Sequence, residues 1–375
     1  MSELTLAVDP GGSFLKGFFT LENFKPELIL MEPEVAVVPI KSLESYEQAK
    51  IGSSSPENSA WIEYKGKHQA VGFLARKRFH AGLQLQRRKF ELAVPKVLAM
   101  VGAIAEQHDL PNGSKVRIGI LLPWGEYKDR DLFNTLITEA LANYKFRGCE
   151  KSFVVDLFIC LPEGGGVLTR GRAPGSSLKE QTIAVVMLGY RDASILLVER
   201  GEMSVGHTEP LGFAKLVESV KSQTSGLSDL HLVRAICKAG KNVSPKALEE
   251  LVVSLDSAYK NHELSTIRAA ISNAREEYWM MLSQWLKLQV PRSTDEVLLA
   301  GGTANFLRPE LNSFFSFSQI NWCEQLEKQV LSSFSQQVAT KSLDYRLTDV
   351  YGLFFYLCGK KHKAASITQV KSHVS

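Results

Sequence analysis

The sequence lacks any apolar run of roughly 18 residues, the length that a membrane-spanning helix needs. Its first residues also lack a basic segment followed by a hydrophobic one, so we expect no signal peptide and a cytoplasmic location. Paired cysteines are absent as well. The five cysteines are far apart and none forms a C-x-x-C spacing, which argues against both a disulfide framework and a zinc site.

An excess of charge of one sign is also missing, because 44 Lys and Arg accompany 40 Asp and Glu and leave a formal net charge of +4. We therefore expect no direct sequence-specific nucleic-acid binding. The lack of a long apolar run gives the further expectation that the protein does not insert into a membrane. Basic clusters occur at 76–78, 87–89 and 360–363. A solvated surface is the favoured interpretation of each, and contact with an acidic partner, nucleic acid or a neighbouring subunit is the alternative.

The first half of the chain alternates strand and helix patterns. Residues 4–8 and 13–21 predict two strands of a hairpin, and residues 89–106 carry apolar residues at helical spacing. Pro95 would be tolerable in that helix only within its first turn. Strongly apolar strands are predicted at 115–123 and 153–161, which indicates an α/β protein.

The second half opens with a similar pattern, because a strand at 182–188, a turn at 189–192 and a strand at 193–199 predict another hairpin. This is a weak internal repeat at the level of pattern. Residues 211–288 are mostly helical in pattern, and a buried strand at 297–300 follows. With 375 residues, of which 45% are hydrophobic, two domains are expected.

The turn of the first hairpin reads Asp9-x-Gly11-Gly12-Ser13-x-x-Lys16. Small residues in such a turn allow backbone N–H groups to approach an anion, so the turn could hold a phosphate. Asp9 would then hold a hydrated cation, and Lys16 would neutralise phosphate charge. A tight turn that is rich in glycine only for conformational reasons is the alternative.

A second glycine-rich turn, at 301–305, follows four buried apolar residues and precedes a short helix. Its two glycines would let the backbone lie flat against a purine or a phosphate. A turn that only ends the strand and begins the helix is the alternative. The order of the three features, with a phosphate-type hairpin first, a second hairpin in the middle and a double-glycine turn late, favours a nucleotide site.

These motifs resemble those of the actin, Hsp70 and sugar-kinase superfamily, and within it the plasmid-segregation ATPases called ParM or StbA and their archaeal actin-like relatives. Asp9 to Lys16 resembles the first phosphate motif, residues 187–191 lie where the second falls, and residues 300–305 resemble the adenosine motif. Residues 118–127 and 346–352 resemble the two elements that connect the domains. The similarity extends from Leu4 to Leu357.

The resemblance implies an α/β, actin-like fold in which two related ribonuclease-H-like domains surround a nucleotide cleft, with a helical insertion in the second domain. The implied bounds are 1–170 for the first domain with an excursion at 40–85, 171–345 for the second with the insertion at 211–290, 346–358 for a C-terminal helix returning to the first domain, and 359–375 for a frayed basic tail.

The resemblance also implies roles for individual residues. The cofactors would be ATP, or GTP, and Mg²⁺. Asp9 would hold the metal through water, and Glu163 would orient the attacking water, so these two form the expected catalytic pair. The expected nucleotide-binding residues are Asp9, Gly11, Gly12, Ser13, Phe14, Lys16, Gly189, Tyr190, Arg191, Gly212, Gly301, Gly302, Thr303 and Asn305.

Met187 departs from the pattern, because the family has an aspartate there that contacts the water shell of the metal. Methionine has neither the charge nor the oxygen for that contact. Asp192, later in the same turn, is an alternative source of the carboxylate. We expect a slow nucleoside triphosphatase whose hydrolysis is impaired by Met187.

The resemblance implies a protein that polymerises into filaments when it binds nucleotide. Its partners would be other copies of itself and an adaptor of the ParR type that binds DNA or another cargo, as in plasmid segregation. A bacterial cytoskeletal filament that organises cell shape or the envelope is one alternative, and a small-molecule kinase of the same fold is another. An Hsp70-like chaperone is disfavoured because the chain has no β-rich C-terminal module.

Overall fold

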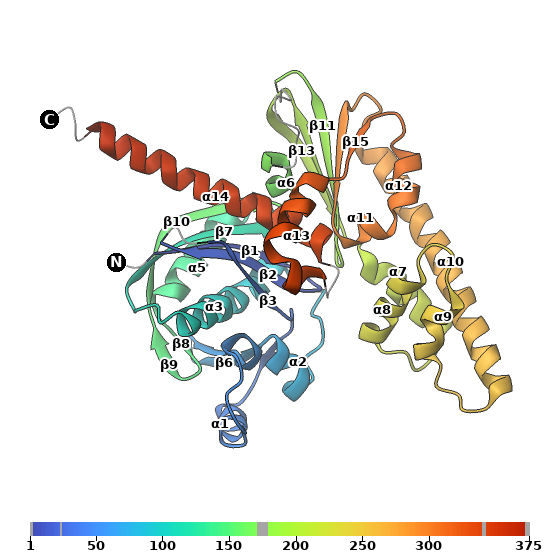
Figure 1. Cartoon of the computed structure of the whole chain (residues 1–375), viewed down its shortest axis with the longest axis horizontal. Helices are drawn as coiled ribbons and strands as arrows, with labels where there is room; N and C mark the ends of the chain where they lie inside the picture. Colours follow the sequence, from blue (N-terminus) through green and yellow to red (C-terminus); the bar gives the residue numbers. More distant parts are fainter. Residues whose placement is uncertain (1–2, 23–24, 171–178, 340–342, 372–375) are drawn as a thin grey trace. The chain divides into compact units, whose positions relative to one another are not determined.

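The computed structural model describes residues 3–22, 25–170, 179–339 and 343–371, and the chain forms two compact units (Figure 1). The first unit comprises Met1–Ser176 and Cys323–Ser375, and the second comprises Ser177–Trp322. The predicted start of the second domain, at residue 171, lies outside the described residues. None of the helices in the described ranges combines the length and the apolar character needed to cross a membrane.

The main sheet of the first unit has the strand order β10-β7-β1-β2-β3. β1, β2 and β3 form an antiparallel meander, whereas β7 and β10 join in parallel. The second half of the parallel strand β7, residues 118–122, is continuously apolar and buried, as expected for a strand whose two faces are both covered. The bounds are β1 Glu3–Pro10, β2 Leu15–Leu21, β3 Glu27–Met31, β7 Ser114–Leu122 and β10 Phe153–Pro162.

Helices cover both faces of this sheet. α3 (Lys89–Gln107) packs on β1 and contacts α5 (Arg130–Ala142), which packs on β10. α14 (Asp344–Lys371) contacts β1, β2 and β7 on the other face, and α13 (Glu324–Ala339) packs beside α14. Because strand side chains alternate, Leu4, Leu6 and Val8 lie in the core under α3.

A second, smaller sheet in the first unit has the order β4-β6-β5-β8-β9, and α2 packs against it. It occupies much of the excursion that the sequence predicted, but β8 and β9 reach it from residues after 140. The bounds are β4 Val35–Val37, α1 Ile40–Gln48, η1 Pro56–Ser59, β5 Trp61–Tyr64, β6 Lys67–Val71, α2 Phe73–Phe79, β8 Tyr144–Phe146 and β9 Cys149–Lys151.

The sheet of the second unit has the order β13-β12-β11-β14-β15, which repeats the order of the first. β11, β12 and β13 again form an antiparallel meander. On the other side of β11, β14 pairs with it in parallel, and β15 pairs in parallel with β14. The prediction of two related α/β domains is therefore confirmed. The bounds are β11 Thr182–Leu188, β12 Ala193–Glu199, β13 Glu202–Glu209, β14 Glu296–Ala300 and β15 Gln319–Asn321.

The predicted helical insertion lies between β13 and β14. Figure 1 shows α7, α8 and α9 gathered beside the long α10. Tyr278 of α10 is fully buried and donates a hydrogen bond to Leu211 O at 2.7 Å, which ties the insertion to the end of β13. The bounds of the insertion are α7 Phe213–Gln223, α8 Asp229–Ala239, α9 Pro245–Leu248, η2 Glu249–Leu251 and α10 Ser257–Gln289. Between β14 and β15 lie α11 Gly302–Phe306 and α12 Arg308–Phe314.

Three local expectations were wrong. Pro95 lies in the second turn of α3, not the first, and the buried surroundings of α3 hold the helix together across it. α14 continues past residue 358 and through Gly359 to Lys371, where a frayed tail was expected, and residues 372–375 of that tail lie outside the described residues. α13 belongs to the first unit, where it packs with α14, although the sequence placed residues up to 345 in the second domain.

Candidate functional site

The turn between β1 and β2 carries the first predicted phosphate motif. Asp9 and Lys16 are register partners, and their side chains form an ion pair, with Lys16 Nζ 2.5 Å from Asp9 Oδ2. Lys16 Nζ also donates to the carbonyl oxygen of Arg346 at 3.1 Å. A Cβ on Gly11 would lie 2.8 Å from Phe14 O, so the turn requires a residue without a side chain there.

Arg346, at the start of α14, holds this turn from one side. Its guanidinium donates to Ser13 Oγ at 2.5 Å and lies over the ring of Phe14, 5.2 Å from the ring centre. The predicted connecting element at 346–352 therefore contacts the predicted phosphate turn directly. Both Ser13 and Phe14 are partly exposed, so the turn keeps access to solvent.

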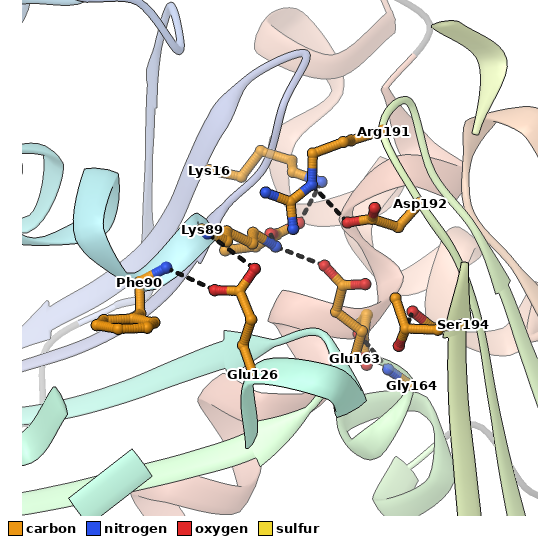
Figure 2. A network of polar contacts seen from close by, with 12 residues as sticks. Lys16, Lys89, Phe90, Glu126, Glu163, Gly164, Arg191, Asp192 and Ser194 are labelled. Atoms are coloured by element: carbon orange, nitrogen blue, oxygen red, sulfur yellow. Dashed lines mark hydrogen bonds and ion pairs between the residues drawn. The ribbon is translucent and has the colours of Figure 1, made fainter. Parts of the chain in front are cut away.

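Lys89 is a residue of this site that the sequence did not predict. It is the first residue of α3, its side chain is 7% exposed, and its Nζ lies 2.9 Å from Asp9 Oδ1 and 2.5 Å from Glu163 Oε1. Figure 2 shows the ammonium group directed at the Glu163 carboxylate. Lys89 thus joins the two residues that the sequence predicted as the catalytic pair.

The interpretation of Lys89 as part of a solvated basic cluster was wrong. A clue was available, because a cation in the first turn of a helix opposes the helix dipole and is disfavoured there. Glu126 compensates for that placement. Its carboxylate accepts hydrogen bonds from the backbone N–H groups of Lys89 at 2.8 Å and Phe90 at 2.9 Å, and so caps α3 (Figure 2).

The charges of this cluster stabilise one another. Burial alone would raise the pKa of Asp9, but the positive charges of Lys16 and Lys89 and their hydrogen bonds outweigh it and hold the pKa far below its ordinary value. Burial would likewise lower the pKa of Lys89, but Asp9 and Glu163 outweigh it and raise that pKa. Asp9 is therefore a carboxylate and Lys89 an ammonium ion at neutral pH.

A buried carboxylate, Asp349 of α14, positions the turn that carries Glu163. It accepts hydrogen bonds from the N–H groups of Gly164 at 2.7 Å, Gly166 at 2.8 Å and Val167 at 3.1 Å. Glu163 N in turn donates to Leu122 O at 2.8 Å, which fixes the turn to the end of β7. Burial raises the pKa of Asp349 to about 7.

The predicted Mg²⁺ does not fit these residues as they are arranged. Each oxygen of Asp9, the residue expected to hold the hydrated cation, pairs with an ammonium group, and Lys89 also pairs with Glu163. Within the described parts of the chain, no three His, Cys, Asp or Glu side chains are grouped so that they could hold a metal ion. Mg²⁺ binds through several oxygen ligands and keeps much of its water, which needs more room than an ammonium group.

In the second unit, the structure brings three predicted nucleotide-binding segments together at one end of the sheet. Thr303 Oγ1 donates to Gly189 O at 2.7 Å and links the late glycine turn to the β11–β12 turn. Gly212 N donates to Arg191 O at 3.0 Å. Gly301 has φ +102°, and a Cβ there would overlap Leu188 O, so only glycine fits.

The remaining predicted residues lie in or beside these turns. Arg191 Nε forms an ion pair with Asp192 Oδ2 at 2.6 Å, as Figure 2 shows, so Asp192 shares its charge with a cation. Met187 is the register partner of Ser194, near the end of β11. Tyr190 is partly buried, and burial raises its pKa to about 12. Asn305 lies in α11, one residue before its end, and is partly exposed.

The structure therefore groups the predicted residues within each unit. Gly12 lies in the β1–β2 turn of the first unit, and Gly302 begins α11 of the second. The first unit holds the acidic pair and the phosphate turn, and the second holds the glycine-rich turns. Lys89, Glu126 and Asp349 are the members that sequence reasoning missed, since each reaches its partners only through the tertiary fold.

No protein-family model matches the sequence, and a comparison with curated proteins gives no match. Solved structures do match. The actin-like protein Alp7A aligns with a TM-score of 0.63 at 12% identity, covering 98% of this chain and 100% of its own.

This chain has the actin-like fold. Other solved structures that match include Alp12, solved as a filament, with a TM-score of 0.55 at 17% identity over 96% of this chain and 99% of its own. Bacillus thuringiensis ParM, solved with ADP, has a TM-score of 0.55 at 13% identity over 96% of this chain and 99% of its own. The predicted resemblance is thereby confirmed at the level of the fold.

Proposed function

We propose that this actin-like chain binds a nucleoside triphosphate and assembles with copies of itself into filaments in the cytoplasm. The observation that carries the proposal is the link from Thr303 to Gly189, which joins the predicted adenosine turn to the predicted second phosphate turn. Gly301 and Gly212 allow the chain to pack closely at these turns, because a Cβ at either position would overlap the backbone of Leu188 or Tyr190. The Asp9 to Lys16 turn of the first unit would contact the phosphates.

The comparisons support this proposal through proteins of the same fold. One of them was solved with ADP, and another was solved as a filament. Nucleotide-dependent assembly needs head-to-tail contacts that do not close, which give a fibre instead of a ring. A bound nucleotide would favour the conformation that makes those contacts.

Within this proposal, the filament would move or position a cargo through an adaptor of the ParR type that binds DNA. Hydrolysis would be slow, because Met187 has no carboxylate to offer near the phosphates. A filament that organises cell shape or the envelope would use the same nucleotide-binding and assembly steps. A small-molecule kinase would share the nucleotide site but would not assemble.

Sedimentation of the purified full chain with ATP, GTP, ADP or no nucleotide, together with phosphate release, tests the proposal. We expect a pellet that depends on ATP or GTP and slow phosphate release. Asn305→Ala should weaken nucleotide binding and assembly together, whereas Asn134→Ala, on the exposed face of α5, should change neither. A chain that binds ATP and stays monomeric in every condition would overturn the filament proposal and favour the kinase.

A further inference from the structure

Lys89 occupies a position that no nucleotide motif of the sequence predicted. Its ammonium group lies within 2.9 Å of Asp9 and 2.5 Å of Glu163 and is almost completely buried. The carboxylates of Asp9 and Glu163 are largely buried, and two such groups that face the same point repel each other unless one is protonated or a cation lies between them. In this chain the cation is part of the protein.

From this arrangement we infer that the Lys89 ammonium replaces the divalent cation of the phosphate site, so that nucleotide binding does not require Mg²⁺. The inference rests on the proposed function, because it concerns the same nucleotide. It differs from the sequence-based expectation, in which Asp9 holds hydrated Mg²⁺ and Glu163 orients water.

The available charge supports the replacement. Asp9 and Glu163 contribute two negative charges, and Lys16 and Lys89 contribute two positive charges within hydrogen-bond distance of them. The four side chains therefore balance one another and leave little net attraction for a further cation. Arg346, whose guanidinium contacts Ser13 of the phosphate turn, adds a positive charge that a phosphate could use.

The geometry supports it as well. Glu126 holds the backbone N–H groups of Lys89 and Phe90, so the base of the Lys89 side chain is fixed where α3 begins. From there the side chain reaches both carboxylates, and each of them accepts a hydrogen bond from its Nζ. A hydrated metal ion could enter only if this ammonium group left its two partners.

The sequence of the second unit points the same way. Met187 stands where the actin-like resemblance implies an aspartate, and a thioether sulfur is a poor ligand for a hard cation such as Mg²⁺. Asp192, the other candidate in that turn, pairs with Arg191 at 2.6 Å. Methionine thus stands in place of the implied aspartate at residue 187. The two carboxylates that the sequence offered to a metal, Asp9 and Asp192, both pair with cationic side chains.

An ion network that only fastens α3 to the sheet would produce the same contacts, so the test must separate the two roles. The decisive measurement is the affinity of the wild-type full chain for ATP, by calorimetry, in EDTA and in excess Mg²⁺. We expect the dissociation constants to agree within about twofold, because the cation is already present as Lys89. If the Lys89 network only fastens α3 to the sheet, nothing predicts that the affinity for ATP is independent of Mg²⁺.

The variant Lys89→Met keeps the length and much of the volume of the side chain and removes its charge. We expect its ATP affinity in EDTA to fall by about tenfold or more, and Mg²⁺ to restore part of the loss. Lys77→Met, the same change on an exposed turn of α2, should leave both affinities unchanged. Thermal unfolding followed by circular dichroism shows whether each variant is folded.

Mn²⁺ alone, followed by electron paramagnetic resonance, supplies a readout that does not involve nucleotide. The wild-type chain should bind no Mn²⁺ at this site, whereas Lys89→Met should bind it beside Asp9 and Glu163, which lose Lys89 as a partner. If Lys89→Met does not fold, the wild-type measurements with ATP and with Mn²⁺ still show whether Lys89 replaces the divalent cation.

The outcomes separate the inference from the proposed function. Wild-type affinity for ATP that rises more than about tenfold with Mg²⁺ would overturn the inference and leave the proposed function intact. Mn²⁺ bound by the wild-type chain in competition with Lys89 would overturn it too. Failure to bind ATP or GTP in both buffers would instead overturn the proposed function, and the inference with it.

Discussion

Gly352 and Gly166 lie back to back where α14 passes α6 (Gly165–Arg170). A Cβ on Gly352 would overlap the carbonyl oxygen of Gly166, and a Cβ on Gly166 would overlap the carbonyl oxygen of Asp349. Both overlaps involve backbone atoms, which cannot rotate away as a side chain can. This close approach brings the Asp349 carboxylate within reach of the turn that carries Glu163.

The change Gly352→Ala should therefore destabilise the protein. We expect the free energy of unfolding in urea to fall by about 1–3 kcal/mol or more, because one methyl group must push two backbone segments apart. Gly359→Ala is the matched control in the same helix, since an added Cβ there meets nothing within 4 Å. It should raise stability by up to about 1 kcal/mol through helix propensity. Equal stability of Gly352→Ala and wild type would contradict the close approach.

Glu126 should contribute to stability as the cap of α3. In Glu126→Ala, the N–H groups of Lys89 and Phe90 lose their acceptor, and we expect a loss of about 1–2 kcal/mol in chemical unfolding. Glu218→Ala removes an exposed glutamate from α7 and should stay within about 0.5 kcal/mol of wild type. If Glu126→Ala were as stable as Glu218→Ala, Glu126 would not cap α3.

Thr303 should matter through its hydroxyl group. Thr303→Val keeps the shape of the side chain but cannot donate to Gly189 O, and we expect a loss of about 1 kcal/mol in unfolding free energy. Under the proposed function, ATP affinity should fall as well, because the two glycine-rich turns lose their link. Thr303→Ser keeps the donor and should recover most of the ATP affinity. If Thr303→Val and Thr303→Ser bind ATP equally, the link has no part in binding.

The buried carboxylate of Asp349 should make stability depend on pH. Burial raises its pKa in the folded protein to about 7, above the ordinary value of 3.8, so the folded state binds the proton more tightly than the unfolded state. The contribution of Asp349 to the free energy of unfolding is complete at pH values below its pKa in the unfolded chain. That contribution is lost as the pH rises through about 7, its pKa in the folded chain. Relative to Asp349→Asn, which does not titrate, the wild-type chain should therefore lose stability between pH 5 and about 8.

Urea unfolding of wild type and Asp349→Asn at several pH values across this range measures the difference. Asp131→Asn, on the exposed surface of α5, serves as the control and should follow the wild-type curve. A constant difference between wild type and Asp349→Asn would show that Asp349 keeps the same protonation state in the folded and unfolded chains.

Local sequence pattern predicted the principal strands well. The strand expected at 115–123 is Ser114–Leu122, and the helix expected at 89–106 is Lys89–Gln107. These elements are buried, so their apolar residues follow the period of the strand or helix. β13 (Glu202–Glu209) was not predicted, because it is a largely exposed edge strand with no strong apolar alternation. β8 and β9 have three residues each, too few to show a period.

The sequence by itself determined the two repeated hairpins, the glycine-rich turns and the actin-like fold that they indicate, because those features depend on short-range periodicity and on glycine. Only the tertiary structure decided what lies between Asp9 and Glu163. Lys89 is 80 residues from the first and 74 from the second, and its neighbours Arg87 and Arg88 make it look like part of a solvated surface. Its burial and its two carboxylate partners follow from the packing of α3 against the sheet, which no local pattern specifies.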